Sequence, residues 1–281
     1  MSDFIDFFVK SDIITNYEKG GFFMGENKPI IPNAKIQTAI SNYAFINRDD
    51  ITDIVIPNGI KSIGERAFAK CKNLKRITLP ESLEFIGASA FSECENLEEI
   101  ILPKNLKRLN YRTFGDCKRL KRIVIPEGIE ELDWGIFAGC DNLEEVVLPE
   151  SLKKIDKQLF LNCKKLKKVN IPSTIQQLPD ECFKGCSSLD IILNDTIVEL
   201  DNRVFEDCFK LSSFPSHVKS FGENCFRNCR SITSANINEQ TSTLSDGMFD
   251  GCINLTNINS SKKLKIGKKC FRNWLLSTCF E

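Results

Sequence analysis

A phenylalanine recurs through this sequence at a spacing of 21 to 23 residues, and this period constrains the fold more than any other feature. The phenylalanines in register are Phe45, Phe68, Phe91, Phe114, Phe137, Phe160, Phe183, Phe205, Phe226, Phe249 and Phe271. Nine of them are followed three residues later by a cysteine, and three residues after that by leucine or isoleucine. Units this short cannot bury an apolar side alone, so they must stack and share one continuous core. The spacing therefore predicts a solenoid.

Each unit contains a short apolar segment that ends at a proline. In residues 74–92 this segment ends at Pro80, and the same stop recurs at Pro57, Pro103, Pro126, Pro149 and Pro172. Proline removes a donor from a strand ladder and fits the end of a strand. Leu83 and Ile86 form a second core-facing segment, and residues 87–91 are expected to turn or to form a short helix. We therefore expect one parallel strand per coil, about 4.8 Å from the next.

A period of about 20 to 29 residues with several leucine-like columns is typical of leucine-rich repeats. Residues 51–74, ITDIVIPNGIKSIGERAFAKCKNL, resemble the BspA-like leucine-rich-repeat family, whose pattern runs roughly L-x-x-I-x-I-P-x-x-L-x-x-I-G-x-x-A-F-x-x-C-x-x-L. The resemblance covers about residues 31 to 275 and weakens after Cys186, where Asn194, Asn238 and Ser260 fall near the expected prolines. It implies a non-enzymatic solenoid of a kind associated with cell-surface adhesion and protein binding.

The predicted architecture is a leucine-rich-repeat solenoid, an α/β-type right-handed curved rod of about 11 coils over residues 31–273. A solenoid exposes its core at both ends unless a further segment covers it. Residues 1–30 are rich in apolar side chains and are predicted to form an N-terminal cap. In residues 274–281, Trp274 takes the place of the repeated cysteine, which predicts a C-terminal cap or a surface for self-association.

Nine of the 13 cysteines occupy the column three residues after the phenylalanines. The column consists of Cys71, Cys94, Cys117, Cys140, Cys163, Cys186, Cys208, Cys229 and Cys252. Stacking brings equivalent Cα atoms within disulfide range, so a disulfide ladder or a metal site is one interpretation. However, all nine side chains would point into the core, where free cysteine packs as a small hydrophobe. We therefore expect a ladder of reduced, buried thiols, and no metal.

The charged residues after each repeated leucine alternate in sign from one coil to the next. The pairs are Lys75 and Arg76, Glu98 and Glu99, Lys121 and Arg122, Glu144 and Glu145, and Lys167 and Lys168. Opposite charges facing one another across neighbouring strands stabilise a sheet, whereas like charges destabilise it. The alternation is interpreted as a device that sets the register of the coils. The alternative is a charged binding face.

Two groups of residues are candidates for binding a partner. Residues that flank the buried position of each strand should face outward, and they include Ile101, Val124 and Val147. These three would form an apolar stripe between charged rims that contain Arg122 and Glu145, as in an interaction surface. Ordinary β-propensity on a half-covered sheet would explain the same residues.

The second candidate is an aromatic pair, Tyr111 and Trp134, three residues before the phenylalanine in two successive units. Tyrosine and tryptophan dominate the energetics of many protein interfaces. Local packing of one ring over the other is the alternative explanation.

Charge and motifs exclude several functions. Lys plus Arg and Asp plus Glu both number 38, and a net charge of zero argues against nucleic acid and against an anionic membrane surface. No apolar run reaches the ~18 residues of a membrane span, and the N-terminus has no basic region ahead of an apolar run. These features predict a cytoplasmic protein, whereas the family resemblance implies the cell surface.

Catalysis is not expected. The sequence has no phosphate-binding or dinucleotide-binding glycine motif and no nucleophile elbow. Its one histidine, His217, is predicted to be a surface residue without a catalytic partner. The sequence therefore predicts a non-catalytic protein-binding module without a cofactor. The alternatives are an adhesin-like surface protein that binds host or matrix proteins and, disfavoured by the motifs, an enzyme.

Overall fold

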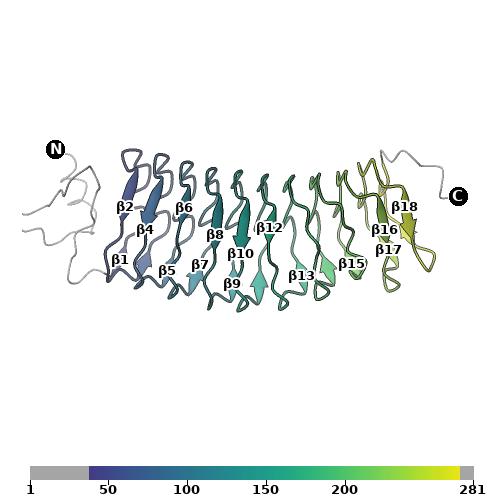
Figure 1. Cartoon of the computed structure of the whole chain (residues 1–281), viewed down its shortest axis with the longest axis horizontal. Helices are drawn as coiled ribbons and strands as arrows, with labels where there is room; N and C mark the ends of the chain where they lie inside the picture. Colours follow the sequence, from purple (N-terminus) through teal and green to yellow (C-terminus); the bar gives the residue numbers. More distant parts are fainter. Residues whose placement is uncertain (1–37, 273–281) are drawn as a thin grey trace, which may run out of the picture.

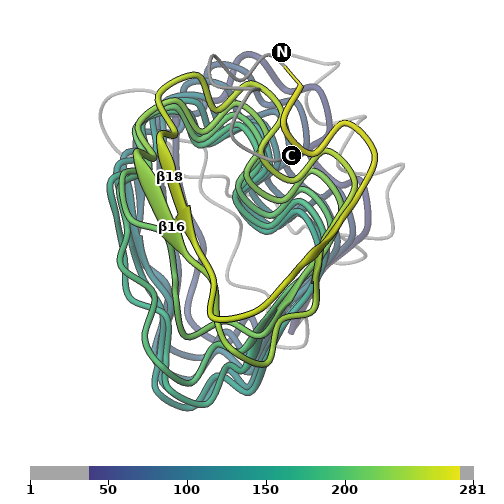
Figure 2. The same cartoon turned by 90° about the vertical axis from the view of Figure 1, so that its right-hand side faces the viewer.

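Residues 38–272 are described by the computed structural model, and they form a parallel β-solenoid of about 10 coils (Figure 1). The rod is elongated, with the ends of the described chain at its two tips. Viewed along the rod, the coils superimpose around a common interior (Figure 2). The repeat thus determines the architecture as expected. The predicted caps, residues 1–30 and 274–281, lie outside the described residues.

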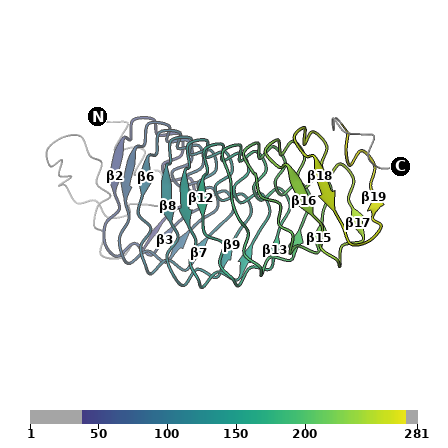
Figure 3. The same ribbon diagram turned by 45° about the vertical axis from the view of Figure 1, so that its right-hand side comes forward.

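Two rows of short strands run along the rod (Figure 3). The front row consists of β2 (Asp53–Val55), β4 (Arg76–Thr78), β6 (Glu99–Ile100), β8 (Arg122–Val124), β10 (Glu145–Val147), β12 (Lys168–Val169), β16 (Ser234–Asn236) and β18 (Asn257–Asn259). These strands form three parallel sheets, β2-β4-β6, β8-β10-β12 and β16-β18. The pairing register equals one repeat, as in Ile54 opposite Ile77. Equivalent side chains therefore stack on one another.

The second row arises from the other core-facing segment of each unit, for which no strand was predicted. It consists of β1 (Ala39–Ile40), β3 (Ser62–Ile63), β5 (Phe85–Ile86), β7 (Arg108–Leu109), β9 (Glu131–Leu132), β11 (Lys154–Ile155), β13 (Gln177–Leu178), β14 (Glu199–Leu200), β15 (Ser220–Phe221), β17 (Thr243–Leu244) and β19 (Lys265–Ile266). The first six pair in one sheet. Most coils therefore contain two strands instead of the expected one.

The segment around each phenylalanine is a turn, and no helix occurs between residues 38 and 272. The expected helical alternative fails because the N–H groups here bond to the next coil: Arg66 donates to the carbonyl of Ala88 (2.9 Å) and Phe68 to that of Ala90 (2.8 Å). Arg66 and Lys70 also have φ angles of 50° and 62°, outside the range of a right-handed helix.

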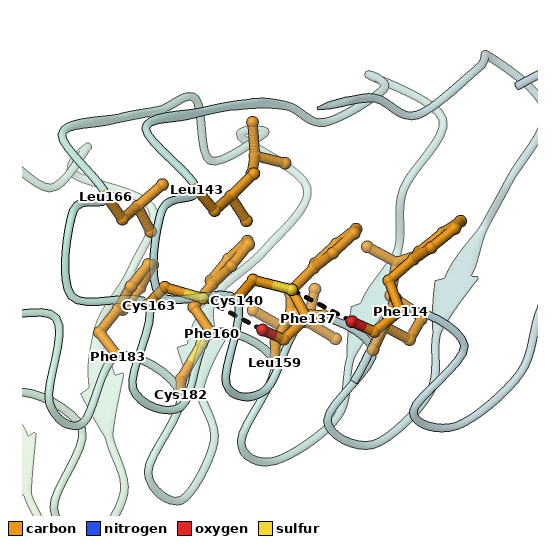
Figure 4. Packing of buried hydrophobic residues seen from close by; sticks show 14 of the residues in the cluster. Phe114, Phe137, Cys140, Leu143, Leu159, Phe160, Cys163, Leu166, Cys182 and Phe183 are labelled. Atoms are coloured by element: carbon orange, nitrogen blue, oxygen red, sulfur yellow. Dashed lines mark hydrogen bonds between the residues drawn. The ribbon is translucent and has the colours of Figure 1, made fainter. Parts of the chain in front are cut away.

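The phenylalanine column forms the centre of the core. Consecutive rings from Phe45 to Phe271 lie nearly parallel, with centroid separations between 4.9 and 5.9 Å. Figure 4 shows four of these rings, with leucines above and cysteines beside them. Because each ring contacts the ring before and after it, the core is continuous along the rod.

The cysteine column packs against these rings, as the spacing predicted. Each column thiol donates a hydrogen bond to the carbonyl of the phenylalanine one coil earlier, as from Cys140 to Phe114 and from Cys163 to Phe137, both at 3.1 Å (Figure 4). The cysteines between residues 38 and 272 are free and buried. The hydrogen bond satisfies a buried carbonyl of the turn segment, so the thiol has a polar as well as an apolar role.

The alternating charges face one another across the front row. Glu99 lies opposite Arg76, and Glu145 lies opposite both Arg122 and Lys168. A further ion pair joins Nζ of Lys167 to a carboxylate oxygen of Glu144 (3.0 Å). This arrangement supports the interpretation of the charges as a device for coil register.

Reversing Glu98 and Glu99 together to lysine is expected to lower Tm by roughly a few degrees at low salt and by less at high salt, because exposed pairs are screened. Thermal unfolding followed by circular dichroism at two salt concentrations measures this. Glu150→Lys with Glu239→Lys changes the net charge equally in turns outside the strands. If the two double variants change Tm equally, and by the same amount at both salt concentrations, the result would count against the charge pairing.

Candidate functional site

An outward-facing column runs along the front row at the position just after the buried residue of each strand. We call this the front column, and it contains Val55, Thr78, Ile101, Val124, Val147 and Asn170. Ile101 is 82% exposed and Val124 41% exposed, whereas Val147 is partly buried. The structure therefore turns the predicted apolar stripe outward.

The edges of the front column are polar, but their charges are neutralised. Nε of Arg122 lies 3.0 Å from a carboxylate oxygen of Glu145 across β8 and β10. An apolar centre with a paired, polar rim resembles the surface that proteins present to other proteins. The structure thus brings five predicted residues together on one face: Ile101, Val124, Val147, Arg122 and Glu145.

The aromatic pair lies on another side of the coil. Tyr111 follows β7 and Trp134 follows β9, so both belong to the second row of strands. Their ring centroids are 6.2 Å apart, and Nε1 of Trp134 donates a hydrogen bond to Gln158 (2.5 Å). The guanidinium of Arg112 lies 5.9 Å from the centre of the Trp134 ring. These contacts join the two rings to their neighbours, while Tyr111 is 42% exposed, and the pair is not joined to the front column.

Two consecutive coils are shortened on the front row. From the repeated leucine to the usual proline position there are six steps in Leu166–Pro172, five in Leu189–Asn194 and four in Leu211–Pro215. Because side chains in a strand alternate with a period of two, losing one residue breaks the register with the neighbouring coil. Accordingly, residues 186–222 contribute no strand to the front row.

The shortened coils enclose a pocket of about 170 Å³. Its wall comes from residues 191–193 in one coil and 213–217 in the next, and the buried side chains of Phe205 and Leu211 form its floor. Phe214 does not fill this space, because its ring packs toward the following coils, 5.2 Å from Phe226 and 5.8 Å from Phe249 between centroids. The missing residues and the direction of Phe214 together account for the pocket.

The pocket lies on the front column. Ile192 stands two residues before Asn194, the position that Asn170 holds before Pro172, and Ser213 stands two before Pro215. Ile192 is 84% exposed. Beyond the polar Asn170, the front column therefore has one more exposed apolar residue, Ile192, which belongs to the lining of the pocket.

His217, predicted to be a surface residue, lies in the wall of this pocket with its side chain 25% exposed. Its Nδ1 lies 3.6 Å from a carboxylate oxygen of Asp195, in the previous coil. Its Nε2 is buried and has no hydrogen-bond partner among the described residues. The partner was missed because it stands 22 positions away, which is one shortened repeat.

The titratable core groups are poorly suited to nucleophilic chemistry. Burial raises the pKa of Cys71 and of Cys252 to about 12, and raises the pKa of Cys117 further above its ordinary value of 9.0. Within residues 38–272, no group of three or more His, Cys, Asp or Glu side chains could hold a metal ion. In the same part of the chain, no helix is long and apolar enough to cross a membrane.

Comparison with known proteins agrees with this geometry. The family profile described as BspA type leucine rich repeat region (6 copies) matches residues 38–167 and 154–277. A leucine-rich repeat protein from Bacteroides ovatus, of known structure, is 27% identical, with a TM-score of 0.70 over 92% of this chain and 78% of its own. No curated protein matches significantly.

Two further solved structures share the fold. A leucine rich cell surface protein from Faecalibacterium prausnitzii is 21% identical, with a TM-score of 0.59, 85% of this chain covered and 88% of its own. The pneumococcal vaccine antigen PcpA is 20% identical, with a TM-score of 0.57, 80% of this chain covered and 66% of its own. At identities this low, the similarity shows a shared solenoid fold and nothing about function.

Proposed function

Because this chain belongs to the BspA-type leucine-rich repeat family, we propose that it is a non-catalytic protein-binding module that binds its partner through the front column. The observation that carries this proposal is the exposed apolar stripe on the stacked strands of the front row, with Ile101 82% and Val124 41% exposed. Large side chains this exposed in a monomer mark a surface that a partner can cover. The paired charges of Arg122 and Glu145 supply a polar rim without a strong field of one sign.

Location separates two versions of this function. A scaffold inside the cell is one version. An adhesin-like surface protein is the version favoured by similarity to a protein named as a cell surface protein. The cysteines are compatible with either, because buried thiols of raised pKa react slowly with oxidants. Fractionation of the source cell with an antibody to this chain distinguishes the two.

The test of the binding face uses the whole protein as bait in matched forms. The first variant joins Ile101→Lys to Val124→Lys. The control joins Ile253→Lys to Ile266→Lys, at positions 41% and 43% exposed and outside the front row. A third bait joins Tyr111→Ala to Trp134→Ala. Each bait is exposed to lysate of the source cell and, separately, to extracellular-matrix proteins.

We expect a specific protein to be retained by the wild type and the control but lost from the front-column variant, since a buried lysine in an apolar interface is costly. Capture from lysate would support the scaffold, and capture of matrix protein would support the adhesin. If only the aromatic variant fails to capture the protein, the binding site lies at Tyr111 and Trp134 and not on the front column. Identical capture by the front-column variant and the wild type would refute the proposed face.

A further inference from the structure

The pocket between the shortened coils has the size of a side-chain site. Sites for small molecules and cofactors are usually about 300 to 1,000 Å³, whereas this pocket measures about 170 Å³. An engineered cavity of about 150 Å³ in another protein accommodates benzene. The space therefore fits one ring, with little room for a larger ligand.

The walls favour an aromatic occupant. Phe205 and His217 belong to the lining, and so does Phe214, although its ring packs toward Phe226. Ile191 and Leu211 add aliphatic residues. Aromatic rings gain stability from ring-to-ring contact beyond the apolar area that they bury. The chain itself stacks rings at this core, with Phe205 5.7 Å from Phe226. An incoming ring would extend the same kind of packing toward the surface.

One carboxylate belongs to the pocket lining and stands in solvent. Asp195 belongs to the wall and its side chain is 97% exposed. The other ionisable member of the wall is His217, and no lysine or arginine belongs to it. Because the carboxylate stands in solvent next to an apolar floor, it can attract a cation that is attached to an apolar group.

From size, aromatic walls and charge, we infer that this pocket takes an aromatic side chain from a basic segment of a protein partner. The inference rests on the proposed function and names the anchor point of that interface. The pocket is continuous with the front column through Ile192 and Ser213, so the partner that covers Ile101 can reach it. Four coil steps separate Ile101 from Ile192, which is about 19 Å at ~4.8 Å per step. An extended segment of about six residues spans that distance.

The test uses small probes, so it does not depend on a known partner. The first probe is N-acetyl-4-fluorophenylalanyl-lysine amide, and the second carries glutamate in place of lysine. Fluorine NMR of each probe is recorded with the whole protein. The lysine probe is expected to broaden and shift saturably, with a Kd on the order of 1 mM. The glutamate probe should bind several-fold more weakly.

Variants locate the binding. Ser213→Phe fills the pocket and should abolish binding of the lysine probe, whereas Ser234→Phe, an exposed front-row position in β16, should leave it unchanged. Ile192→Ser removes an exposed wall residue without touching the core, and should weaken binding even if Ser213→Phe does not fold. Asp195→Asn should remove the preference for lysine over glutamate while the ring still binds.

The outcomes separate this inference from the proposed function. Equal broadening of the probe signal with wild type, Ser213→Phe and Ile192→Ser would show that the probe does not bind in the pocket, and the inference would be wrong. The capture experiment on Ile101 and Val124 does not depend on this result. If the probe binds but Ser213→Phe captures the partner as well as wild type does, the partner does not use the pocket and the inference is wrong. Analytical sedimentation tests for self-association. If wild type self-associates and Ser213→Phe does not, the pocket takes a second copy of this chain, and the inference of a basic partner segment is wrong.

Discussion

Replacing Phe137 by alanine is expected to lower the free energy of unfolding by about 3 to 5 kcal/mol. Its ring is completely buried, and its centroid lies 5.9 Å from that of Phe114 and 5.7 Å from that of Phe160. The substitution therefore leaves a cavity between two rings that cannot approach one another, because the strands beside them hold the coils at a fixed spacing. Urea denaturation followed by circular dichroism measures the change.

The position of the phenylalanine in the rod should decide the cost. In a solenoid, stability is close to a sum of coil terms and neighbour terms, so a central ring contributes to two interfaces. Phe271 stacks on Phe249 at 5.9 Å at the end of the described rod and is only partly buried. Phe271→Ala should cost clearly less than Phe137→Ala. A second probe, tryptophan fluorescence in a Trp274→Phe background so that Trp134 reports alone, checks whether the array still unfolds as one unit. Equal costs at the two positions would contradict a continuous stacked core.

The second large effect is expected in alkaline solution, where the protein should unfold cooperatively soon above pH 9. All 12 described cysteines are free and buried. Burial raises the pKa of Cys71, Cys252 and Cys270 from 9.0 to about 12, and raises that of Cys117 and of the other inner thiols as well. In the unfolded chain these groups return to their ordinary pKa.

The sign follows from proton binding. Above pH 9 the unfolded chain releases thiol protons that the folded chain keeps, so the unfolded state is favoured as the pH rises. Stability is therefore fully present below pH 9 and falls as pH increases toward the folded pKa values. Each thiol contributes up to about 1.4 kcal/mol per pH unit. With 12 such groups, the summed loss of unfolding free energy exceeds the whole stability of a typical domain within about one or two pH units above pH 9.

Circular dichroism across pH 7 to 11 measures this transition. A variant with Cys117, Cys140 and Cys163 replaced by alanine should lose stability less steeply with pH, although its stability at pH 7 will be lower because volume is removed from the core. An unchanged slope in the variant would show that other groups drive the alkaline transition.

Thiol titration at pH 7 provides an independent check on the buried column. A membrane-permeant or small thiol reagent should label few cysteines in the folded protein and nearly all of them in denaturant without reductant. Few free thiols in the denatured, unreduced protein would mean that the column forms disulfides, and the alkaline prediction would fail with it.

The residues of the core could be read from the sequence because a repeat places equivalent residues in contact. Once Phe114, Phe137 and Phe160 are known to recur at a fixed spacing, stacking of the coils requires their rings to meet. The same reasoning places Cys140 in the interior and turns Val124 outward. Local alternation and the stop at proline carry this information, so no knowledge of distant contacts is needed.

Other features depend on contacts between coils that the period does not specify. The turn beside each phenylalanine could have been a short helix, but the N–H of Phe68 bonds to Ala90 in the next coil. The period did not show whether Tyr111 and Trp134 share a face with the front column, and the structure places them beside the second row of strands. Their separation reflects which corner of the coil each position occupies.

The sequence by itself determined the solenoid, its core columns and the outward stripe, because each follows from residues that repeat. Only the tertiary structure decided that the shortened repeats leave a pocket. The sequence shows that residues are missing between Leu211 and Pro215, but not whether the neighbouring coils close the gap. The ring of Phe214 could have filled that space. It packs against Phe226 and Phe249 instead, and this choice between two apolar surroundings depends on three-dimensional packing that no local pattern encodes.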